Sequence, residues 1–171
     1  MISVARGLGA YSGHWGGRTM RVSAKLPVIL MAAALVVGLA ACGKSEKTAT
    51  PEDAKAMALK AAAYLKELGP EKAFDAFTNS PEWKDGDLYV WADDKNGVSV
   101  AHGFQPELVG TNELDVPDAD GKYYMHDVVA VEDQGWVDYH WKSPTTGEIV
   151  PKTSYIVRVG DYVVGVGAYK Y

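Results

Sequence analysis

A lysine, a histidine and a set of Tyr and Trp side chains are the residues of this sequence best suited to binding a small ligand. A lysine ammonium supplies charge and donors, Tyr hydroxyls donate and accept hydrogen bonds, and indole N–H groups donate. Their carbon frames supply the apolar wall that ligand pockets also need. The candidates are Tyr89, Trp91, His102, Trp136, Tyr139, Trp141, Lys152 and Tyr155.

Each of these candidates also has a purely structural interpretation. Tyr and Trp side chains commonly pack in a core while a neighbouring group satisfies the polar tip. Lys152 could be a solvated lysine on a strand, and His102 could be held by structural hydrogen bonds. The sequence leaves both interpretations open for each residue, and the candidates carry more weight as a set than singly.

Catalysis and metal binding have little support in the residue pattern. The sequence lacks Gly-x-Ser-x-Gly and His-Glu-x-x-His motifs, and Cys42 is its only cysteine. His102, His126 and His140 have acidic neighbours, but their spacing matches no known zinc-ligand pattern. We therefore expect no enzyme, no catalytic residues, no metal and no cofactor, with a histidine metal site as the weaker alternative.

Three runs rich in Val, Ile, Tyr and Trp predict an antiparallel meander that carries most of the candidates. The runs cover about 135–141, 149–159 and 162–169, and Pro, Gly, Ser and Thr separate them. The last run contains Gly165-x-Gly167, which is not a phosphate-binding loop because no helix follows it.

An earlier hairpin completes the predicted sheet. Residues 87–92 and 98–102 have strand character, and Asn96-Gly97 between them is a strong hairpin signal. Asp93 and Asp94 are interpreted as residues of that turn. The period of two along a strand puts Tyr89 and Trp91 on one face of the sheet.

Two helices are predicted before the hairpin. Thr50 is a suitable N-cap, Pro51 suits the first helical position, and Gly69-Pro70 ends the first helix. A second, short helix covers 71–77. The apolar stripe of the first helix predicts packing against the sheet, with a partner-binding face as the alternative.

A covering segment follows the hairpin. Residues 103–117 form a loop with several Gly and Pro residues, and 122–133 predict a short helix, although 128–131 would also suit a strand. The order of elements predicts an α+β fold with a five-stranded antiparallel sheet and helices on one side. The loop-helix segment covers the sheet, and the space beneath it is the expected pocket.

The amino-terminal region has the organisation of an export signal. A basic start at Arg21 and Lys25 precedes an uncharged run from Leu26 to Ala41. This run is shorter than the roughly 20 residues that a membrane-spanning helix needs. It ends in Leu39-Ala40-Ala41-Cys42, which resembles the lipobox of bacterial lipoproteins.

The lipobox resemblance divides the first 50 residues into three parts. It implies that residues 20–41 are a lipoprotein signal peptide and that Cys42 is lipidated as the first mature residue. Residues 42–50 would then be a lipid-anchored tether, and several acyl chains would anchor it stably. Residues 1–19 are predicted to be an extension upstream of the true start. An uncleaved anchor is the alternative.

The ordered motifs of the remaining chain resemble the single Cache domain, an extracytoplasmic sensor domain of bacterial chemoreceptors and histidine kinases. The motifs are Asp87-Leu88-Tyr89-Val90-Trp91, Val100-Ala101-His102, Leu108-Val109-Gly110, Asp120-Gly121-Lys122, Gly135-Trp136-Val137-Asp138-Tyr139, Pro144-Thr145-Thr146-Gly147, Pro151-Lys152-Thr153-Ser154-Tyr155 and Gly165-Val166-Gly167-Ala168-Tyr169. The resemblance implies that residues 51–171 form one such domain with a PAS-like sheet. It also implies a small-molecule ligand, often a short carboxylate, between the sheet and the covering loop.

This resemblance makes Lys152 the expected cation for a carboxylate and the neighbouring hydroxyl and indole groups the expected donors. Family sensors usually continue into a transmembrane helix and a signalling module, whereas this sequence ends at Tyr171. We therefore expect a sensor in signal transduction that acts through a membrane kinase, a chemoreceptor or a transporter. The alternative is a protein-interaction or scaffolding lipoprotein whose pocket is filled by its own side chains.

Net charge limits the range of partners. Residues 42–171 carry 13 Lys and Arg against 22 Asp and Glu. Such an acidic domain is poorly suited to binding phosphates, so no nucleic-acid partner is expected. The expected location is outside the cytoplasm, lipid-anchored to a bacterial membrane and facing the periplasm or the cell exterior.

Overall fold

The computed structural model describes residues 49–171. The predictions for residues 1–19, for the signal peptide at 20–41 and for Cys42 lie outside the described residues, as does most of the tether. Within the described part, no helix is both long enough and apolar enough to cross a membrane.

Helix α1 (Pro51–Leu68) begins and ends where its sequence signals predict. The Thr50 hydroxyl accepts a hydrogen bond from the Asp53 backbone N–H at 3.2 Å, and an Asp53 carboxylate oxygen accepts one from the Thr50 N–H at 3.1 Å. Gly69 has a φ of 78° and ends the helix, and α2 (Pro70–Asn79) begins directly after it. The two helices therefore form one bent unit.

The sheet contains the five predicted strands and one short additional strand. The strands are β1 (Lys84–Asp85), β2 (Leu88–Asp94), β3 (Ser99–His102), β4 (Gln134–Lys142), β5 (Ile149–Val159) and β6 (Tyr162–Tyr169). All pairs are antiparallel, and the order is β1-β2-β6-β5-β4, with β3 also paired to β2. The sequence analysis missed β1 because two residues have no readable period. Short 3₁₀ helices occupy Pro81–Trp83 and Pro106–Leu108.

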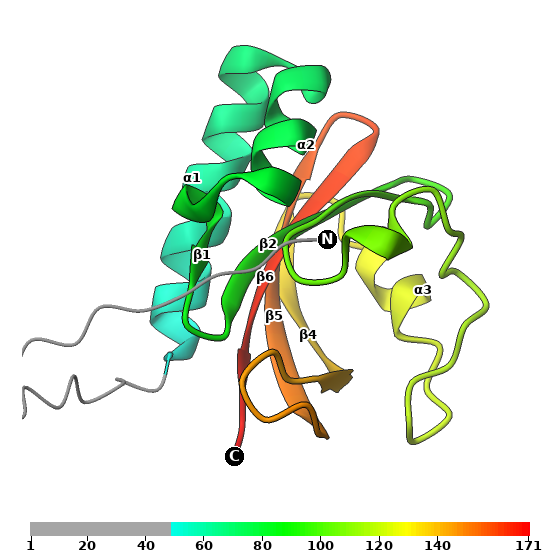
Figure 1. Cartoon of the computed structure of the whole chain (residues 1–171). Coiled ribbons are helices and arrows are strands. Elements are labelled where there is room, and N and C mark those ends of the chain that lie inside the picture. Colours follow the sequence, from blue (N-terminus) through cyan, green and yellow to red (C-terminus); the bar gives the residue numbers. More distant parts are fainter. Residues whose placement is uncertain (1–48) are drawn as a thin grey trace, which may run out of the picture. The chain divides into compact units, whose positions relative to one another are not determined.

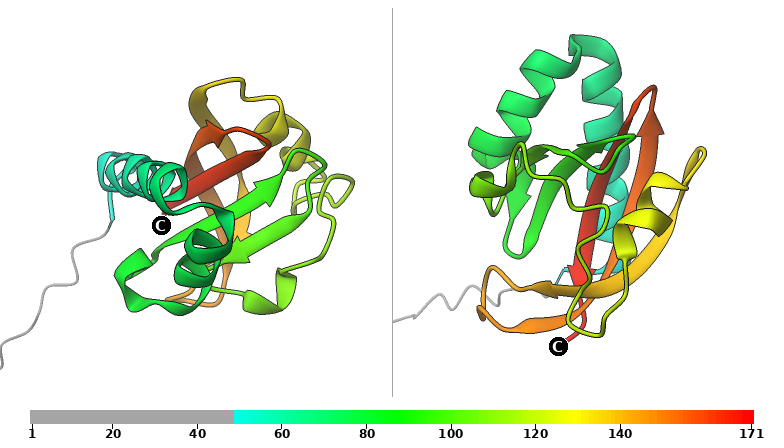
Figure 2. Two further views of the ribbon diagram at one scale, coloured as in Figure 1. Left: turned by 90° about the horizontal axis from the view of Figure 1, so that it is seen from above. Right: turned by 90° about the vertical axis from the view of Figure 1, so that its right-hand side faces the viewer.

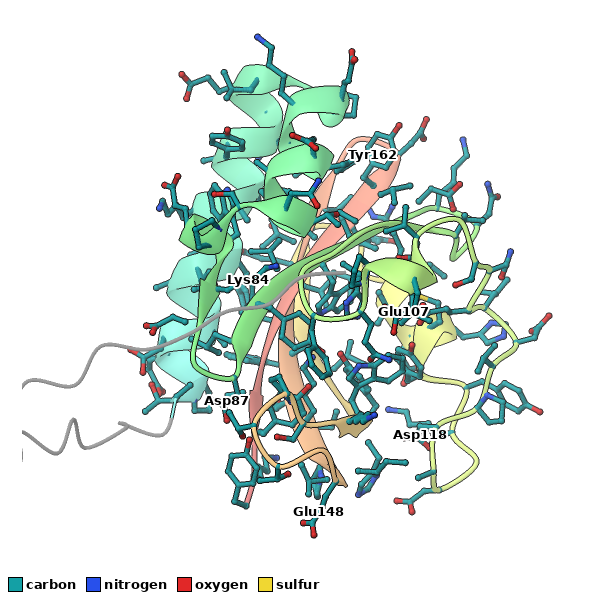
Figure 3. All side chains as sticks on the ribbon, viewed as in Figure 1. Lys84, Asp87, Glu107, Asp118, Glu148 and Tyr162 are labelled. Carbon is teal, nitrogen blue, oxygen red and sulfur yellow. The ribbon has the colours of Figure 1, made fainter. Side chains whose placement is uncertain are left out.

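Helices and the covering segment occupy opposite faces of the sheet (Figures 1 and 2). Helices α1 and α2 pack on one face. The loop after β3 and the short helix α3 (Tyr124–Val129) lie over the other face. Side chains fill the space between this cover and the sheet (Figure 3). Within the ambiguous segment 122–133, Tyr124–Val129 is helical and residues 128–131 form no strand.

Two separate apolar clusters result from the alternation of strand side chains. The helix-side cluster contains Leu88 and Val90 of β2 together with α1 and α2 residues such as Ala58. The cover-side cluster contains Tyr89 and Trp91 with residues of α3. The predicted division of β2 into two faces is confirmed, and it directs the polar-tipped aromatics toward the cover.

Candidate functional site

Lys152 is a buried cation on the cover side of the sheet. It lies on β5, is only 1% exposed, and its Nζ donates a hydrogen bond to the Tyr89 hydroxyl at 2.8 Å. The Nζ also lies 4.1 Å from the ring centre of Tyr89, 4.9 Å from that of Tyr169 and 5.8 Å from that of Tyr139. Lys152 forms no ion pair with any residue in 49–171. The printed contacts of its Nζ are therefore one neutral hydroxyl and three aromatic rings.

Burial is the main influence on the protonation of Lys152. Desolvation holds the pKa of its ammonium well below the ordinary value, and the more distant Asp87 and Glu113 raise it only in part. A buried ammonium without a counter-ion is costly, and a bound anion would relieve that cost. The environment of Lys152 thus favours capture of a small anion.

Strand register and two glycines place this lysine. Lys152 pairs with Tyr139 on β4 and with Tyr169 on β6. A Cβ atom at Gly167 would overlap the Lys152 side chain, and one at Gly165 would overlap the Trp91 ring. The Gly165-x-Gly167 motif, which the sequence analysis set aside, therefore clears the sheet surface for two site residues.

A small cavity lies between the sheet and the cover beside Lys152. Its volume is about 10 Å³, which is room for roughly one water molecule. The lining residues are Trp91, Asp93, His102, Glu113, Tyr124, Met125, Tyr139, Trp141 and Lys152. Five of the eight predicted site residues are among them, and Tyr89 joins the site through its hydrogen bond to Lys152.

Trp136 and Tyr155 lie on the opposite face and are not part of this cluster. Their rings pack against each other with centres 4.8 Å apart, and Tyr155 belongs to the helix-side cluster. Trp136 lies an odd number of positions from Tyr139 on β4, and Tyr155 lies an odd number of positions from Lys152 on β5. Because strand side chains alternate between faces, Trp136 and Tyr155 point to the face opposite the site. Their assignment to the ligand site is corrected accordingly.

Two buried acids belong to the cavity wall, and the sequence analysis missed both. Asp93 is not a turn residue: it lies on β2, two positions from Trp91 on the same face, and is 3% exposed. Burial raises the pKa of its carboxyl well above the ordinary value, and Glu113 and Asp94 raise it further. The sequence predicted that this strand ends at residue 92, whereas β2 continues to Asp94. With the longer strand, the alternation of Tyr89, Trp91 and Asp93 would have placed Asp93 on the same face as the two aromatic residues.

Glu113 comes from the covering loop. Its carboxylate accepts a hydrogen bond from the Tyr124 hydroxyl at 2.6 Å. Burial raises the pKa of Glu113, and the hydrogen bond from Tyr124 and the charge of Lys152 oppose that rise. No local pattern distinguishes this glutamate from other loop acids, because its burial depends on how the loop folds back over the sheet.

His102 is a neutral hydrogen-bond acceptor in this structure. Its Nδ1 accepts hydrogen bonds from the backbone N–H groups of Phe104 at 3.3 Å and Gln105 at 2.9 Å. Burial lowers the pKa of the imidazole to about 3, with Lys152 and Lys84 adding to the effect. His102 therefore shapes the start of the covering loop and also lines the cavity.

We expect His102→Asn to flatten the acid side of the stability profile. The unfolded chain binds a proton at His102 below its ordinary pKa of 6.5, whereas the folded protein does so only near 3. The contribution of His102 to wild-type stability is therefore fully present above pH 6.5. As the pH decreases below 6.5, the free energy of unfolding falls by up to about 1.4 kcal/mol per pH unit. Asparagine keeps an acceptor oxygen and does not titrate. Urea unfolding at pH 7 and pH 4.5 measures the difference, and parallel profiles for the two proteins would contradict the assignment.

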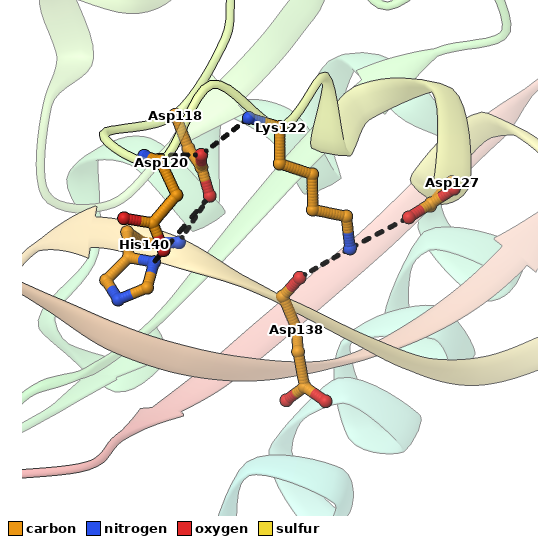
Figure 4. A network of polar contacts seen from close by, with 6 residues as sticks. All are labelled: Asp118, Asp120, Lys122, Asp127, Asp138 and His140. Carbon is orange, nitrogen blue, oxygen red and sulfur yellow. Dashed lines mark hydrogen bonds and ion pairs between the residues drawn. The ribbon is translucent and has the colours of Figure 1, made fainter.

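A polar network fastens the covering loop to the edge strand β4 (Figure 4). One Asp118 carboxylate oxygen accepts from the His140 backbone N–H at 2.8 Å, and the other accepts from the N–H groups of Asp120 and Lys122. Burial raises the pKa of Asp118, but these backbone donors lower it more, so the net shift is downward. Lys122 Nζ reaches the Asp138 carbonyl at 2.7 Å. A surface hollow of about 230 Å³ borders this network and extends to Tyr139 and Lys152.

The histidines considered as metal ligands lie in three different places. His102 is in the cavity, His126 pairs with Asp115 at 3.1 Å, and His140 pairs with Asp120 at 3.0 Å. Across residues 49–171, no three His, Cys, Asp or Glu side chains are arranged to hold a metal ion.

Part of this chain is similar in sequence to parts of a bacterial sensor kinase and of a chemotaxis protein. Sequence relatives include the sensor histidine kinase MctS of Rhizobium johnstonii, 34% identical over 90 residues, and the methyl-accepting chemotaxis protein McpP of Pseudomonas putida, 32% identical over 90 residues. Each match covers 50% of this chain but only 19% and 16% of those proteins, so the chain spans a small part of their length.

Solved structures share the fold over most of the described chain. A methyl-accepting chemotaxis protein from Vibrio parahaemolyticus has a TM-score of 0.61 at 23% identity, covering 69% of this chain and 86% of that one. The periplasmic sensor domain of a chemotaxis protein has a TM-score of 0.56 at 26% identity, covering 70% and 90%. A Cache chemosensory domain described as recognising carboxylic acids has a TM-score of 0.56 at 24% identity, covering 70% and 88%.

The family assignment rests on a match that is longer than any of these pairwise sequence matches. The family model described as single Cache domain 2 matches residues 44–170, which include every helix and strand of the described fold. This chain therefore belongs to the single Cache domain 2 family of sensor domains.

Proposed function

We propose that this domain senses a small carboxylate, which binds at Lys152 between the sheet and the covering segment. The observation that carries the proposal is the buried Lys152 ammonium, which has no acidic partner within residues 49–171. A carboxylate would supply the missing charge and accept hydrogen bonds from Lys152 and from neighbouring donors. The carboxylic acid recognition described for one solved Cache relative supports the same ligand class.

Ligand entry requires movement of the cover. A cavity of about 10 Å³ is too small for even a two-carbon acid, so side chains of the cover must shift on binding. Binding would thereby change the position of the covering loop, which is a usable output for a sensor.

The tight cavity also supports a second candidate function. If the cavity stays filled by Trp91, Tyr124 and Trp141, the domain would be a protein-interaction module without a small ligand. This candidate predicts no stabilisation by any small molecule, which separates it from the first.

Ligand-linked stabilisation is the direct test between the two candidates. The purified full chain in detergent would be unfolded by heat in the presence of short carboxylates, amino acids, amines and divalent metals. A carboxylate present at 100 times its dissociation constant should add about 2.7 kcal/mol to the free energy of unfolding, which raises the midpoint by several degrees. If no carboxylate in the panel stabilises the protein, the sensor proposal is contradicted and the protein-interaction module is favoured.

The proposed partner is a membrane-embedded kinase, chemoreceptor or transporter that reads the covering loop. Domains of this family are extracellular or periplasmic sensor domains, and the relatives include a histidine kinase and a chemotaxis receptor. We further propose that Cys42 carries the lipid that holds the domain at the outer surface of a bacterial membrane. Metabolic labelling with a radioactive fatty acid should mark the wild-type chain and not Cys42→Ser, and equal labelling of both would rule out this anchor.

A further inference from the structure

Both ends of the covering segment are fastened to the sheet by contacts that do not titrate at physiological pH. Near its start, the Gly110 N–H donates to the Ser99 carbonyl at 2.8 Å, and the Ser99 N–H donates to the Thr111 carbonyl at 2.9 Å. At its end, the Arg158 guanidinium on β5 donates to the Val131 carbonyl at 2.6 Å. An arginine keeps its charge throughout the physiological range. The two ends are therefore held independently of pH.

The middle of the covering segment, residues 114–123, is held to the sheet by charged side chains (Figure 4). Within the described chain, its hydrogen bonds and ion pairs to the sheet come from Asp118, Asp120 and Lys122, and all of them reach β4. The Nδ1 of His140 lies 3.0 Å from the Asp120 carboxylate and 3.8 Å from the Asp118 carboxylate. Loss of these contacts would free the middle while both ends stay attached, which is the arrangement of a lid.

His140 is the member of this junction that changes charge near neutral pH, because histidine ordinarily does so between pH 5 and 8. Burial raises the pKa of Asp118, but its backbone donors lower it more, so this carboxylate stays negative through that range. A protonated His140 is therefore attracted by two carboxylates of the loop. A neutral imidazole offers them at most an uncharged hydrogen bond, which is weaker.

The other charges around His140 leave this sign unchanged. The charged groups that also line the hollow are Asp138 on the same strand, Lys122 of the loop, Lys152 of β5 and Lys170 after β6. Lys122 is paired with Asp127 at 2.8 Å, and Lys170 is paired with Asp138 at 3.5 Å. The Lys152 ammonium donates to Tyr89. The imidazole is thus governed by Asp118 and Asp120.

We infer that residues 114–123 form a lid whose closure on β4 is controlled by pH, with proton uptake at His140 closing it. The inference goes beyond the proposed function, because the lid needs no ligand to move. It bears on that function through Tyr139, the neighbour of His140 on β4. Tyr139 lines the cavity, and its ring stacks on Tyr124 of the cover with centres 4.4 Å apart. Acid closure should therefore also slow the exchange of a carboxylate bound at the proposed site.

Hydrogen exchange at the residue 140 amide tests the lid, because this N–H donates across the junction to Asp118. Exchange is followed by NMR on the full chain in detergent at pH 5.0 and pH 8.0, and each rate is corrected for the intrinsic rate at that pH. Wild-type protection should be about two- to fivefold greater at pH 5.0, the size expected for a partly exposed ion pair. His140→Gln keeps the backbone donor but does not titrate, so its protection should be equal at both pH values.

Two further variants assign the response. His126→Gln is the matched control, because His126 pairs with Asp115 at 3.1 Å inside the covering segment and does not join it to the sheet. This variant should keep the wild-type response. Asp120→Asn removes the acid nearest the imidazole and should reduce the response.

Three outcomes would overturn the inference. They are equal wild-type protection at the two pH values, a response that is lost in His126→Gln, and a response that persists in His140→Gln. The last outcome would assign the pH dependence to the buried acids Asp93 and Glu113 instead. The exchange experiment contains no ligand, so its failure leaves the carboxylate site standing, and a failed carboxylate panel leaves the lid standing.

Discussion

Lys152→Met should abolish carboxylate binding without weakening the fold. Methionine has nearly the length of lysine and fits the same channel over Gly167, but it offers no charge and no donor. Losing a buried charge that pairs with a ligand anion costs about 2–5 kcal/mol, so the affinity should fall by at least about 30-fold. The free energy of unfolding should stay unchanged or rise by about 1–2 kcal/mol, because an unpaired ammonium leaves the interior.

The pH dependence of that stability gain has a definite sign. Burial holds the Lys152 pKa below its ordinary value of 10.5, so between the folded pKa and 10.5 the unfolded chain binds the extra proton. Wild-type stability from this group therefore rises with pH in that window, and the advantage of Lys152→Met should be larger at pH 7 than at pH 9.5. Chemical denaturation of both proteins at the two pH values measures it.

Lys170→Met provides the matched control for this experiment. The Lys170 side chain is 59% exposed and lies 3.5 Å from the exposed Asp138, so its loss should change neither binding nor stability by more than about 0.5 kcal/mol. Wild-type affinity in Lys152→Met would show that the carboxylate binds elsewhere. A loss of several kcal/mol of stability would show that Lys152 is a structural residue.

Gly167→Ala should disrupt both the site and the sheet around it. The added methyl would occupy the space of the Lys152 side chain and of the Ser154 hydroxyl, which accepts or donates the hydrogen bond to Tyr139 at 2.9 Å. Overpacking of this kind costs about 1–3 kcal/mol, and displacement of Lys152 from Tyr89 should weaken carboxylate binding at least about tenfold. Thermal unfolding and calorimetric titration of the same preparation measure the two effects.

Gly135→Ala, on the edge strand β4, is the corresponding control. A Cβ at Gly135 would meet a single atom within 4 Å, the Val131 Cγ2 at 4.0 Å, so the methyl has room. Stability and affinity should both remain close to wild type. Equal behaviour of the two alanine variants would contradict the role of Gly167 in making space for Lys152.

Tight packing gives this site its chemical character. The cover excludes water from Lys152 and from the acids Asp93 and Glu113, and exclusion of water shifts the pKa of each toward its neutral form. A ligand that brings complementary charge into the site gains from interactions that water would otherwise weaken. At the proposed site, the strength of carboxylate binding should therefore depend on how completely the cover closes.

Local sequence signals were sufficient to predict the positions of helix α1 and of the main strands. Thr50 and Gly69-Pro70 bounded α1, and runs of β-branched and aromatic residues located the five main strands. Alternation along β2 correctly placed Tyr89 and Trp91 on one face. Such signals are legible because backbone hydrogen bonding and the strand period involve residues close together in the chain.

Only the tertiary structure decided which residues share the site. Alternation separates Trp136 from Tyr139 and Tyr155 from Lys152, but only the packed sheet shows which member of each pair lies on the face of Tyr89. Glu113 joins because the covering loop folds back over the sheet, and Gly167 matters because Lys152 crosses it. These contacts join residues far apart in sequence, and their formation depends on packing between layers rather than on any local preference of the chain.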